Sequence, residues 1–312
     1  MQLGILVEGE AGLTWDQWRR LVDAAEDRGF DSIWISDHLL PGSGEDRGGL
    51  DAWLALAVAA AGTQRVKLGP LVTPITFRQP GLLARMAANL DSLSQGRFVL
   101  GLGLGWNAHE HAAYDLPFPP LRERARLLEA GLATIRRALP ARVPVLIGGK
   151  GRSSLERVAR HADEWNLTTS SPALYTRLSQ RLAEVCQAVG RDPATIRRSV
   201  LAGILVGENR AELARRGDAM RRLVSGLTDV PRADVPRVVR ERGWVAGTPG
   251  EVVAALRELA EAGVDRAVLG HYDVDDTRVL DLIAGSILPA LERRATSSGR
   301  ASPGATGRLP SA

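Results

Sequence analysis

The most informative stretch of the chain is Ser94-Gln-Gly-Arg-Phe-Val-Leu-Gly-Leu-Gly-Leu-Gly-Trp-Asn-Ala-His-Glu110. It begins as a short apolar strand, continues through alternating glycines and ends in a polar cluster. Alternating glycines let a flat or bulky ligand approach the backbone closely. The dinucleotide fingerprint G-x-G-x-x-G does not fit, because it must open a helix and position 106 is Trp. The stretch therefore predicts a ligand at the end of a buried strand, held by another arrangement.

Length and cysteine content limit the fold and the compartment. The 312 residues suit either two average domains or one α/β barrel, which commonly takes ~250 residues or more. Cys186 is the only cysteine, so we expect no intramolecular disulfide and a cytoplasmic location. Residues 1–7 are typical of a strand rather than of a signal peptide. The longest apolar run, Ala52–Ala61, is too short to span a bilayer, so we expect a soluble protein without a membrane partner.

The basic residues do not indicate a nucleic-acid partner. The formal net charge is +4, and among the basic residues only Lys67 and Lys150 are lysines. Such an arginine excess is typical of GC-rich coding. The basic residues are scattered among acidic ones, whereas a phosphate backbone requires a clustered stripe. Aromatic residues, at 4%, leave few side chains for base stacking, and we expect no binding to nucleic acid.

Strand-like and helix-like segments alternate along the chain. The predicted strands are Leu3–Val7, Ser32–Ile35, Val66–Val72, Phe98–Leu102, Val143–Ile147, Glu164–Leu167, Val200–Val206 and Arg266–Leu269. The predicted helices are Thr14–Asp27, Asp51–Ala61, Gly81–Leu93, Leu121–Ala138, Arg152–His161, Pro172–Val189, Glu208–Leu223, Pro249–Ala262 and Asp275–Leu291. This alternation predicts a single (β/α)8 TIM-type barrel with insertions at the C-terminal face of the strands, where such barrels carry their function.

Two regions depart from the alternation. Leu223–Gly247 contains two prolines and mixed charges, and we expect an insertion or a mobile cover between the seventh and eighth strands. Residues 295–312 lack a pattern that forms a core, so the predicted barrel domain is 1–294 and the predicted tail, 295–312, is disordered.

Polar residues follow the second and third predicted strands. Asp37 and His38 stand at the barrel mouth, where a titratable pair can bind a ligand or move a proton. The alternative is that the pair only caps a loop. Thr73 follows the third strand, and its hydroxyl can contact a cofactor ring, although Pro74 and Pro80 can also serve only to shape the loop and start a helix.

The fifth predicted strand opens through glycines into a helix. Gly148, Gly149 and Gly151 expose backbone N–H groups at a helix N-terminus, where the helix dipole favours an anion, and Lys150 adds positive charge. The segment is not a Walker A loop, because Lys150 is followed by glycine. We expect a phosphate cradle here, with a plain glycine-rich turn as the alternative.

A metal centre is not expected. His109-Glu110-His111 has its histidines two apart, whereas a helical zinc pair needs them four apart on one face. A Ser-His-Asp hydrolase lacks its G-x-S-x-G elbow in this sequence. Cys186 lies in an amphipathic segment and is expected to be a packing residue.

The motifs occur together in one order. They are Gly29–His38, Leu68–Pro74 with Phe77–Pro80, Ser94–Arg97, Gly101–Glu110, Ile147–Gly151, Ala159–Asn166 and Gly247–Glu251. In combination, over roughly residues 1–292, they resemble the luciferase-like monooxygenase superfamily. Ser36-Asp-His38 together with Gly105-Trp-Asn107 resembles the branch that uses the deazaflavin coenzyme F420 rather than FMN.

The resemblance implies an enzyme, an oxidoreductase that passes a hydride between F420 and a small organic substrate. The residues that it places at the cofactor are Asp37, His38 and Thr73 beside the ring, Gly105, Trp106 and Asn107 along the ring and ribityl chain, and Gly148, Gly149, Lys150 and Gly151 at the phosphate. It makes His38 and Glu110 the candidates for acid/base assistance. Family members usually have a small residue where this chain has Lys150, which predicts either a changed phosphate contact or a stronger anion clamp.

Two alternatives remain beside this interpretation. One is an FMN-dependent monooxygenase on the same fold, supplied with reduced flavin by a partner reductase. The other is a non-catalytic flavin-binding or F420-binding protein. The substrate is not identified by the sequence, and we expect its pocket to be set by Glu8–Leu13, Leu39–Leu50 and Leu223–Gly247. The oligomeric state is open, with a homodimer as one option.

Overall fold

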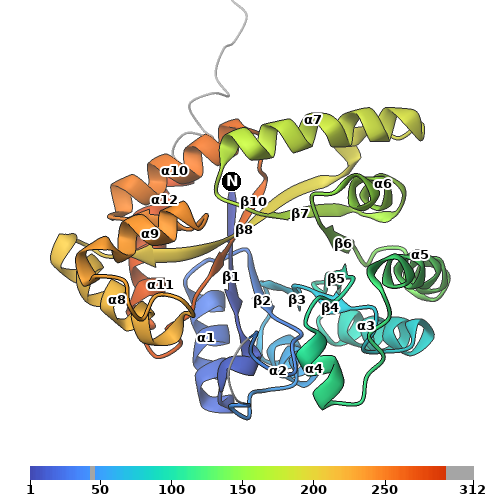
Figure 1. The fold of residues 1–312 in the computed structure, drawn as a ribbon, viewed down its shortest axis with the longest axis horizontal. Coiled ribbons are helices and arrows are strands. Elements are labelled where there is room, and N and C mark those ends of the chain that lie inside the picture. Colours follow the sequence, from blue (N-terminus) through green and yellow to red (C-terminus); the bar gives the residue numbers. More distant parts are fainter. Residues whose placement is uncertain (43–45, 293–312) are drawn as a thin grey trace, which may run out of the picture.

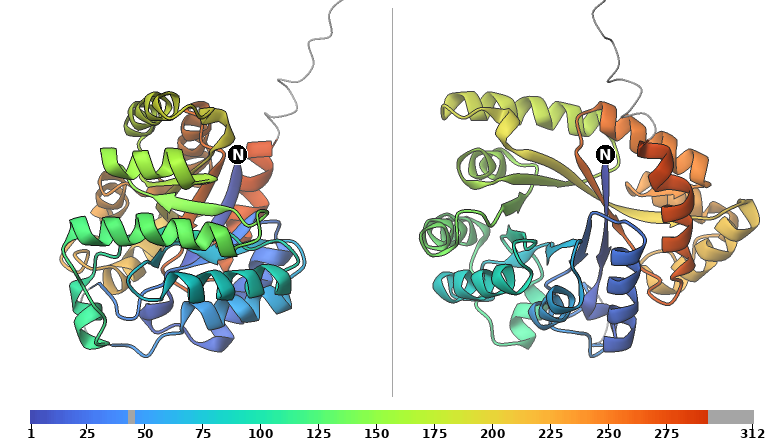
Figure 2. Two further views of the ribbon diagram at one scale, coloured as in Figure 1. Left: turned by 90° about the vertical axis from the view of Figure 1, so that its right-hand side faces the viewer. Right: turned by 180° about the vertical axis from the view of Figure 1, so that it is seen from behind.

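The computed structural model describes residues 1–42 and 46–292. The predicted tail, 295–312, and the predicted domain boundary at residue 294 lie outside the described residues. In the described part, strands stand at the centre and helices surround them (Figure 1). The two turned views show the same layering (Figure 2).

The sheet is parallel and closes on itself. Its strands are β1 (Gln2–Val7), β2 (Ser32–Ile35), β3 (Lys67–Pro70), β4 (Thr73–Pro74), β5 (Leu100–Gly103), β6 (Val145–Gly148), β7 (Glu164–Thr168), β8 (Arg197–Val206), β9 (Val245–Gly247) and β10 (Arg266–Gly270). Their order is β3-β2-β1-β10-β8-β7-β6-β5-β4, with β9 added beside β8. A parallel bridge between Leu68 in β3 and Phe98, just before β5, closes the ring beside the short end strand β4. The predicted (β/α)8 barrel is confirmed.

The helices lie outside the barrel, and their caps explain several of their start points. They are α1 (Trp15–Asp27), α2 (Ala52–Gly62), α3 (Pro80–Leu93), α4 (Ala108–Ala113), α5 (Leu121–Ala138), α6 (Arg152–His161), α7 (Pro172–Ala188), α8 (Arg210–Leu223), α9 (Val235–Glu241), α10 (Pro249–Glu261), α11 (Arg278–Leu282) and α12 (Leu288–Glu292). Thr14 with Gln17 and Thr248 with Glu251 form capping boxes that satisfy the first N–H groups of α1 and α10. Among the described helices, none is long and apolar enough to cross a bilayer.

Apolar side chains fill the inside of the barrel and the layer between sheet and helices. The interior cluster consists of Leu6, Trp34, Leu71, Val99, Leu146 and Val268, which come from different parts of the ring. The larger outer cluster joins the other face of the strands to the helices, and it includes Cys186, which is buried as predicted. Strands that are buried on both faces explain why the sequence shows continuous apolar runs there.

Two predicted elements are wrong in detail. The strand predicted over Val66–Val72 ends at Pro70, although the Leu71 N–H still donates to Ile35, and the next strand, β4, begins at Thr73 and pairs with β5. Proline has no N–H for the ladder, which interrupts the strand. The last helix begins at Arg278 instead of Asp275, because turn hydrogen bonds between residues 273 and 277 precede it. Its middle, Ile283–Ile287, is a π-helical segment between α11 and α12.

The region predicted as an insertion has regular structure of its own. Within Leu223–Gly247 lie α9 and β9, neither of which was predicted, and β9 pairs with the last residues of β8. A separate apolar cluster that includes Leu205, Met220, Val235 and Val239 holds this region against α8. The predicted mobility of the region stays a prediction.

The opposite end of the barrel carries a buried ion-pair network. Arg266 at the start of β10 is fully buried, and its Nε donates to Asp31 at 2.7 Å. Its Nη1 donates to both carboxylate oxygens of Glu164, at 2.9 and 3.1 Å. Its guanidinium also lies 5.5 Å from the ring centroid of Trp34. We assign this buried ion-pair network to the stability of the barrel, because function in such barrels resides at the other face.

Candidate active site

The carboxyl ends of the barrel strands bring the predicted site residues to one edge of the sheet. His38 follows β2, Thr73 lies in β4, Asn107 follows β5 and Gly149 follows β6. β4, β5 and β6 are neighbours in the ring, so the residues that follow them share one side of the barrel mouth. This edge is where parallel barrels place their ligands.

His38 and Glu110 meet in a hydrogen-bonded pair. The His38 Nδ1 lies 3.0 and 3.1 Å from the two carboxylate oxygens of Glu110. The backbone N–H of Leu39 donates to the same carboxylate at 3.0 Å. The Glu110 side chain is fully buried, whereas 21% of the His38 side chain is exposed. A carboxylate at Nδ1 favours the proton there and leaves Nε2 for a substrate oxygen.

Nearby carboxylates shift the protonation of His38. Burial alone lowers the pKa of His38, but the hydrogen bond to Glu110 and the charges of Glu10, Glu110 and Asp37 together raise it above its ordinary value. Glu10 is itself buried and accepts a hydrogen bond from the Ser36 hydroxyl. Burial raises the pKa of Glu10, although the Ser36 hydrogen bond and the His38 charge oppose this rise. The sequence patterns did not single out Glu10.

Asn107 positions Glu110 by capping the helix that carries it. The Asn107 Oδ1 accepts the backbone N–H groups of His109 and Glu110, at 3.1 and 3.4 Å. Within the described residues, its Nδ2 is buried and finds no partner. A buried amide without a partner is costly, so it points to a group that the protein binds here. The short helix α4 was not predicted.

Gly105 and Trp106 form the wall beside this amide. Gly105 has φ +74°, and a Cβ there would lie 3.1 Å from the Thr76 hydroxyl and 3.4 Å from the His111 ring. The Trp106 ring packs edge-on against His38, with 5.4 Å between centroids. The Trp106 residue is 63% exposed, so most of the indole is free to contact a ligand.

Asp37 and Thr73 are buried and bonded to each other. The Asp37 Oδ2 accepts from the Thr73 hydroxyl at 2.7 Å, from the Trp53 indole at 3.0 Å and from Arg78 at 2.6 Å. Arg78 lies in the Phe77–Pro80 motif, which was the only sequence signal for this ion pair. These bonds hold the buried side chain of Asp37, the residue before His38, in one position. Direct contact of Asp37 or Thr73 with a cofactor stays a prediction.

The glycine loop after β6 leads into α6 as predicted. Gly149 has φ +131°, and a Cβ there would lie 2.7 Å from the Ser154 side chain. Gly151 is the N-cap of α6, and no side chain of the described residues caps this helix. Its first turn also lacks an acidic residue, and Lys150 beside it is exposed. Free N–H groups with the positive end of the helix dipole suit an anion.

The three residues His109, Glu110 and His111 point to different partners. His109 is exposed, and Glu110 holds His38. His111 is buried between the Thr76 hydroxyl, 2.7 Å from Nε2, and the Asn107 carbonyl, 2.7 Å from Nδ1. Among residues 1–42 and 46–292, no cluster of histidine, cysteine and acidic side chains could hold a metal ion.

The arrangement can bind a flat group and exchange a proton. The exposed Trp106 and the unpartnered Asn107 amide offer a surface and a donor, and the glycine loop offers an anion site. The His38 imidazole, held by a buried carboxylate, is suited to general acid/base catalysis at a substrate oxygen.

Comparison with known proteins identifies the family and several similar enzymes. The family profile described as luciferase-like monooxygenase matches residues 1–266. The F420-dependent hydroxymycolic acid dehydrogenase of Mycobacterium tuberculosis is 30% identical, over 89% of this chain and 87% of the relative. The F420-dependent glucose-6-phosphate dehydrogenase of Intrasporangium calvum is 29% identical, over 88% of this chain and 95% of the relative.

A solved structure shows the same fold. The coenzyme F420-dependent tetrahydromethanopterin reductase of Methanopyrus kandleri superimposes with a TM-score of 0.75 at 20% identity, over 93% of this chain and 99% of that one. The family profile covers most of the barrel, and a relative is similar along nearly its whole length. The chain belongs to the luciferase-like monooxygenase family.

Proposed function

We propose that the protein is an F420-dependent oxidoreductase that transfers a hydride between the deazaflavin and a small organic substrate. The observation that carries the proposal is the His38–Glu110 pair beside the exposed Trp106 at the barrel mouth. Curated relatives that are similar over most of this chain bear the names of F420-dependent dehydrogenases. Redox chemistry in such enzymes is the cofactor's, and the protein supplies binding, orientation and proton transfer.

The residues at the mouth fit the cofactor. The buried Asn107 Nδ2 has no partner among the described residues, so it can donate a hydrogen bond to an oxygen of the cofactor ring or of its ribityl chain. Gly149 is required by its left-handed φ and by the Ser154 side chain packed against it, and the N-terminus of α6, which no described side chain caps, suits a phosphate. Trp106 and Asn107 would hold the ring and its chain, and Gly148 to Gly151 would hold the phosphate, with Lys150 adding charge. Bound F420 supplies the two-electron hydride chemistry.

The chain's own residues supply the proton. His38 Nε2 gives a proton to the substrate oxygen when a carbonyl is reduced, and takes one when an alcohol is oxidised. Glu110 keeps the ring oriented and stabilises the imidazolium, because it is buried and bonded through Nδ1. The Asp37–Arg78 ion pair, at 2.6 Å, fixes the residue that precedes His38. We place the reaction in the cytoplasm, because Cys186 is buried and free, and a chain with one cysteine needs no oxidising compartment to form an internal disulfide.

Cofactor choice gives the first prediction. The protein should bind F420 at least ~10-fold more tightly than FMN, a difference of ~1.4 kcal/mol. The measurement is a fluorescence titration of the cofactor-free protein with each compound in the same buffer. Equal affinities, or tighter binding of FMN, would assign the chain to the flavin-dependent monooxygenases of the family.

The phosphate cradle gives the second prediction. Gly149→Asp should weaken F420 binding at least ~100-fold, because a side chain collides with Ser154 and a negative charge stands where the phosphate must bind. Gly190→Asp is the matched control, since Gly190 also has a left-handed φ of +72° but has open space around it. Both variants should bind the deazaflavin fragment that lacks the phosphate like the parent. If Gly149→Asp folds and binds F420 as tightly as the parent, the segment is only a glycine-rich turn.

A further inference from the structure

A small cavity lies beside the proton-transfer pair, at the ends of β1 and β10. It has a volume of about 180 Å³, and Glu8, His271 and Tyr272 line it together with Arg47 and Asp273. Glu8 follows β1, and His271 and Tyr272 follow β10, which is the neighbour of β1 in the ring. His38 follows β2, which is the other neighbour of β1 in the ring, so the cavity and the proton-transfer pair lie on the same side of the barrel mouth.

Three polar groups of this cavity have no partner within residues 1–42 and 46–292. His271 is only 4% exposed, and its Nε2 is buried without a hydrogen bond among the described residues. Tyr272 stacks on Trp244 with 4.6 Å between ring centroids, yet its hydroxyl bonds to no described residue. The Glu8 carboxyl likewise makes no hydrogen bond or ion pair within residues 1–42 and 46–292. Buried polar groups in folded proteins are nearly always bonded, so the unpartnered nitrogen of His271 indicates a bound group, and the partly exposed Glu8 and Tyr272 are free to contact it.

The protonation of these groups limits what they can recognise. Burial lowers the pKa of His271 to about 4, so the imidazole is neutral at pH 7, with one donor and one acceptor nitrogen. Burial, followed by the charge of Glu10, raises the pKa of Glu8 to about 7, although His38 opposes the rise. Burial and the charges of Glu8 and Glu10 raise the pKa of Tyr272, which keeps its hydroxyl neutral. A neutral imidazole, a neutral phenol and a carboxyl group with a pKa of about 7 together offer donors and acceptors that suit a hydroxyl group.

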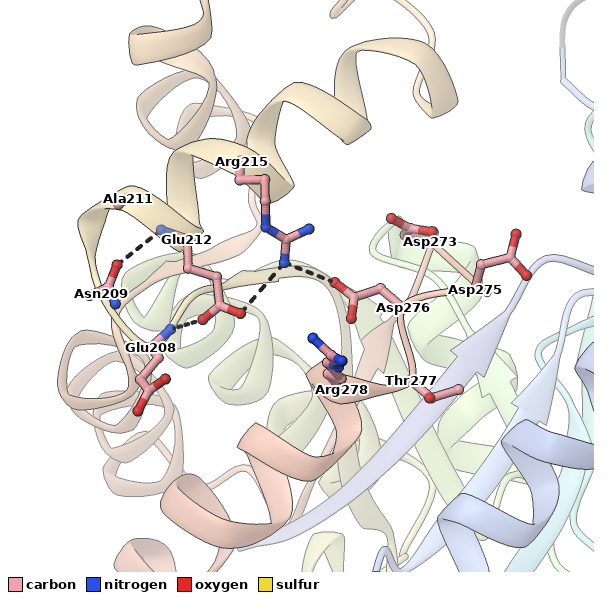
Figure 3. Close-up of a pocket in the computed structure, with 10 residues that line it drawn as sticks. All are labelled: Glu208, Asn209, Ala211, Glu212, Arg215, Asp273, Asp275, Asp276, Thr277 and Arg278. Carbon is pink, nitrogen blue, oxygen red and sulfur yellow. Dashed lines mark hydrogen bonds and ion pairs between the residues drawn. The ribbon is translucent and has the colours of Figure 1, made fainter.

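The surroundings disfavour an anion. The charged residues that line this cavity are Glu8, Asp273 and Asp275 against the single Arg47, and Asp273 and Asp275 also line a wider neighbouring cavity of about 800 Å³. Figure 3 shows that wider cavity, where Arg215 lies between Glu212 and Asp276 and pairs with both. Its lining has acidic residues at 208, 212, 273, 275 and 276 against arginines at 215 and 278. A phosphate or carboxylate approaching from this side meets like charges.

We propose that the cavity lined by Glu8, His271 and Tyr272 binds an uncharged, hydroxyl-bearing part of the substrate, so the enzyme acts on neutral hydroxylated compounds and rejects phosphorylated or carboxylated ones. This proposal rests on the proposed function for the reaction, but the cavity's preference is a binding property. A hydrophobic pocket discriminates weakly against an added group, whereas a site with buried polar groups strongly rejects a ligand that leaves them unpaired.

The test is ligand-observed NMR on the full chain, both without cofactor and with F420, using two probes built on the same six-membered ring. Cyclohexanol should bind at least ~10-fold more tightly than cyclohexanecarboxylate, a difference of ~1.4 kcal/mol. Tyr272→Phe removes one hydroxyl and keeps the stacking on Trp244, and His271→Phe keeps a ring of similar size. Each variant should weaken cyclohexanol binding at least ~5-fold, about 1 kcal/mol for a lost buried hydrogen bond. His161→Phe, in α6, is the matched control and should bind like the parent.

Three results would overturn the proposal: equal or tighter binding of the carboxylate probe, unchanged cyclohexanol binding in both folded variants, or loss of binding in the His161→Phe control. F420 titration separates this proposal from the proposed function. Tyr272→Phe should bind F420 like the parent. If the parent itself fails to bind F420, the proposed reaction is contradicted, but the preference of the cavity for cyclohexanol is still measured in the protein without cofactor.

Discussion

Glu110→Gln should lower turnover by at least ~100-fold while cofactor affinity stays within a few fold. Glutamine keeps the shape and can still accept the Leu39 N–H, but the negative charge that supports the His38 imidazolium is lost in a fully buried position. His38→Ala removes the proton donor itself and should cost a similar factor. Steady-state kinetics with F420 and a reactive alcohol or carbonyl substrate measures both variants.

The two residues act as one unit, and this gives the control. The double variant, His38→Ala with Glu110→Gln, should be no slower than the slower single variant, because removal of either partner already disables the pair. His109→Ala changes an exposed neighbour on the same short helix and should keep nearly parental turnover. Additive losses in the double variant, or parental rates in His38→Ala, would return His38 to a loop-capping role.

The pH profile reports the same pair. The pKa of His38 is raised, mainly through Glu110 and despite burial, so the imidazolium persists to a higher pH than for an ordinary histidine. Carbonyl reduction, which needs the protonated ring, should therefore fall as the pH rises through this raised pKa. Alcohol oxidation should show the opposite slope. In Glu110→Gln the inflection should move to lower pH.

Arg266→Ala should lower the free energy of unfolding by about 3–5 kcal/mol, because it leaves the buried carboxylates of Glu164 and Asp31 without their shared cation. Urea unfolding followed by circular dichroism measures the change. Lys67→Ala is the matched control, since Lys67 also pairs with Asp31, at 3.4 Å, but has 36% of its side chain exposed. An exposed pair contributes ~0–1 kcal/mol.

A second variant separates charge from packing. Arg266→Met with Glu164→Gln removes the cation and one of the two carboxylates while the side chains keep similar sizes. It should recover part of the stability lost in Arg266→Ala, because replacing both partners of a buried ion pair destabilises a protein less than removing one of them. A loss in Arg266→Ala no larger than in Lys67→Ala would mean that the network contributes little.

Local patterns were sufficient for the barrel. Continuous apolar runs alternating with amphipathic stretches predicted the eight barrel strands and most helices, because a strand buried on both faces must be apolar throughout. The errors fell where local preference competes with tertiary contacts. The third strand breaks at Pro70, and α4 and β9 are too short to show a periodicity, so their neighbours decide them.

The motifs were sufficient to place His38, Glu110, Asn107 and the glycine loop at one mouth, since the ends of parallel strands meet at one edge. Whether they contact a cofactor stays a prediction. Pairings between distant residues were out of reach of the sequence. Nothing in it showed that Glu110 bonds His38, 72 positions away, or that Arg78 neutralises Asp37. The sequence determined which groups are available, through residue type and strand order. Only the tertiary structure decided which of them are desolvated and paired, as with the isolated His271, because burial and distance set electrostatic strength.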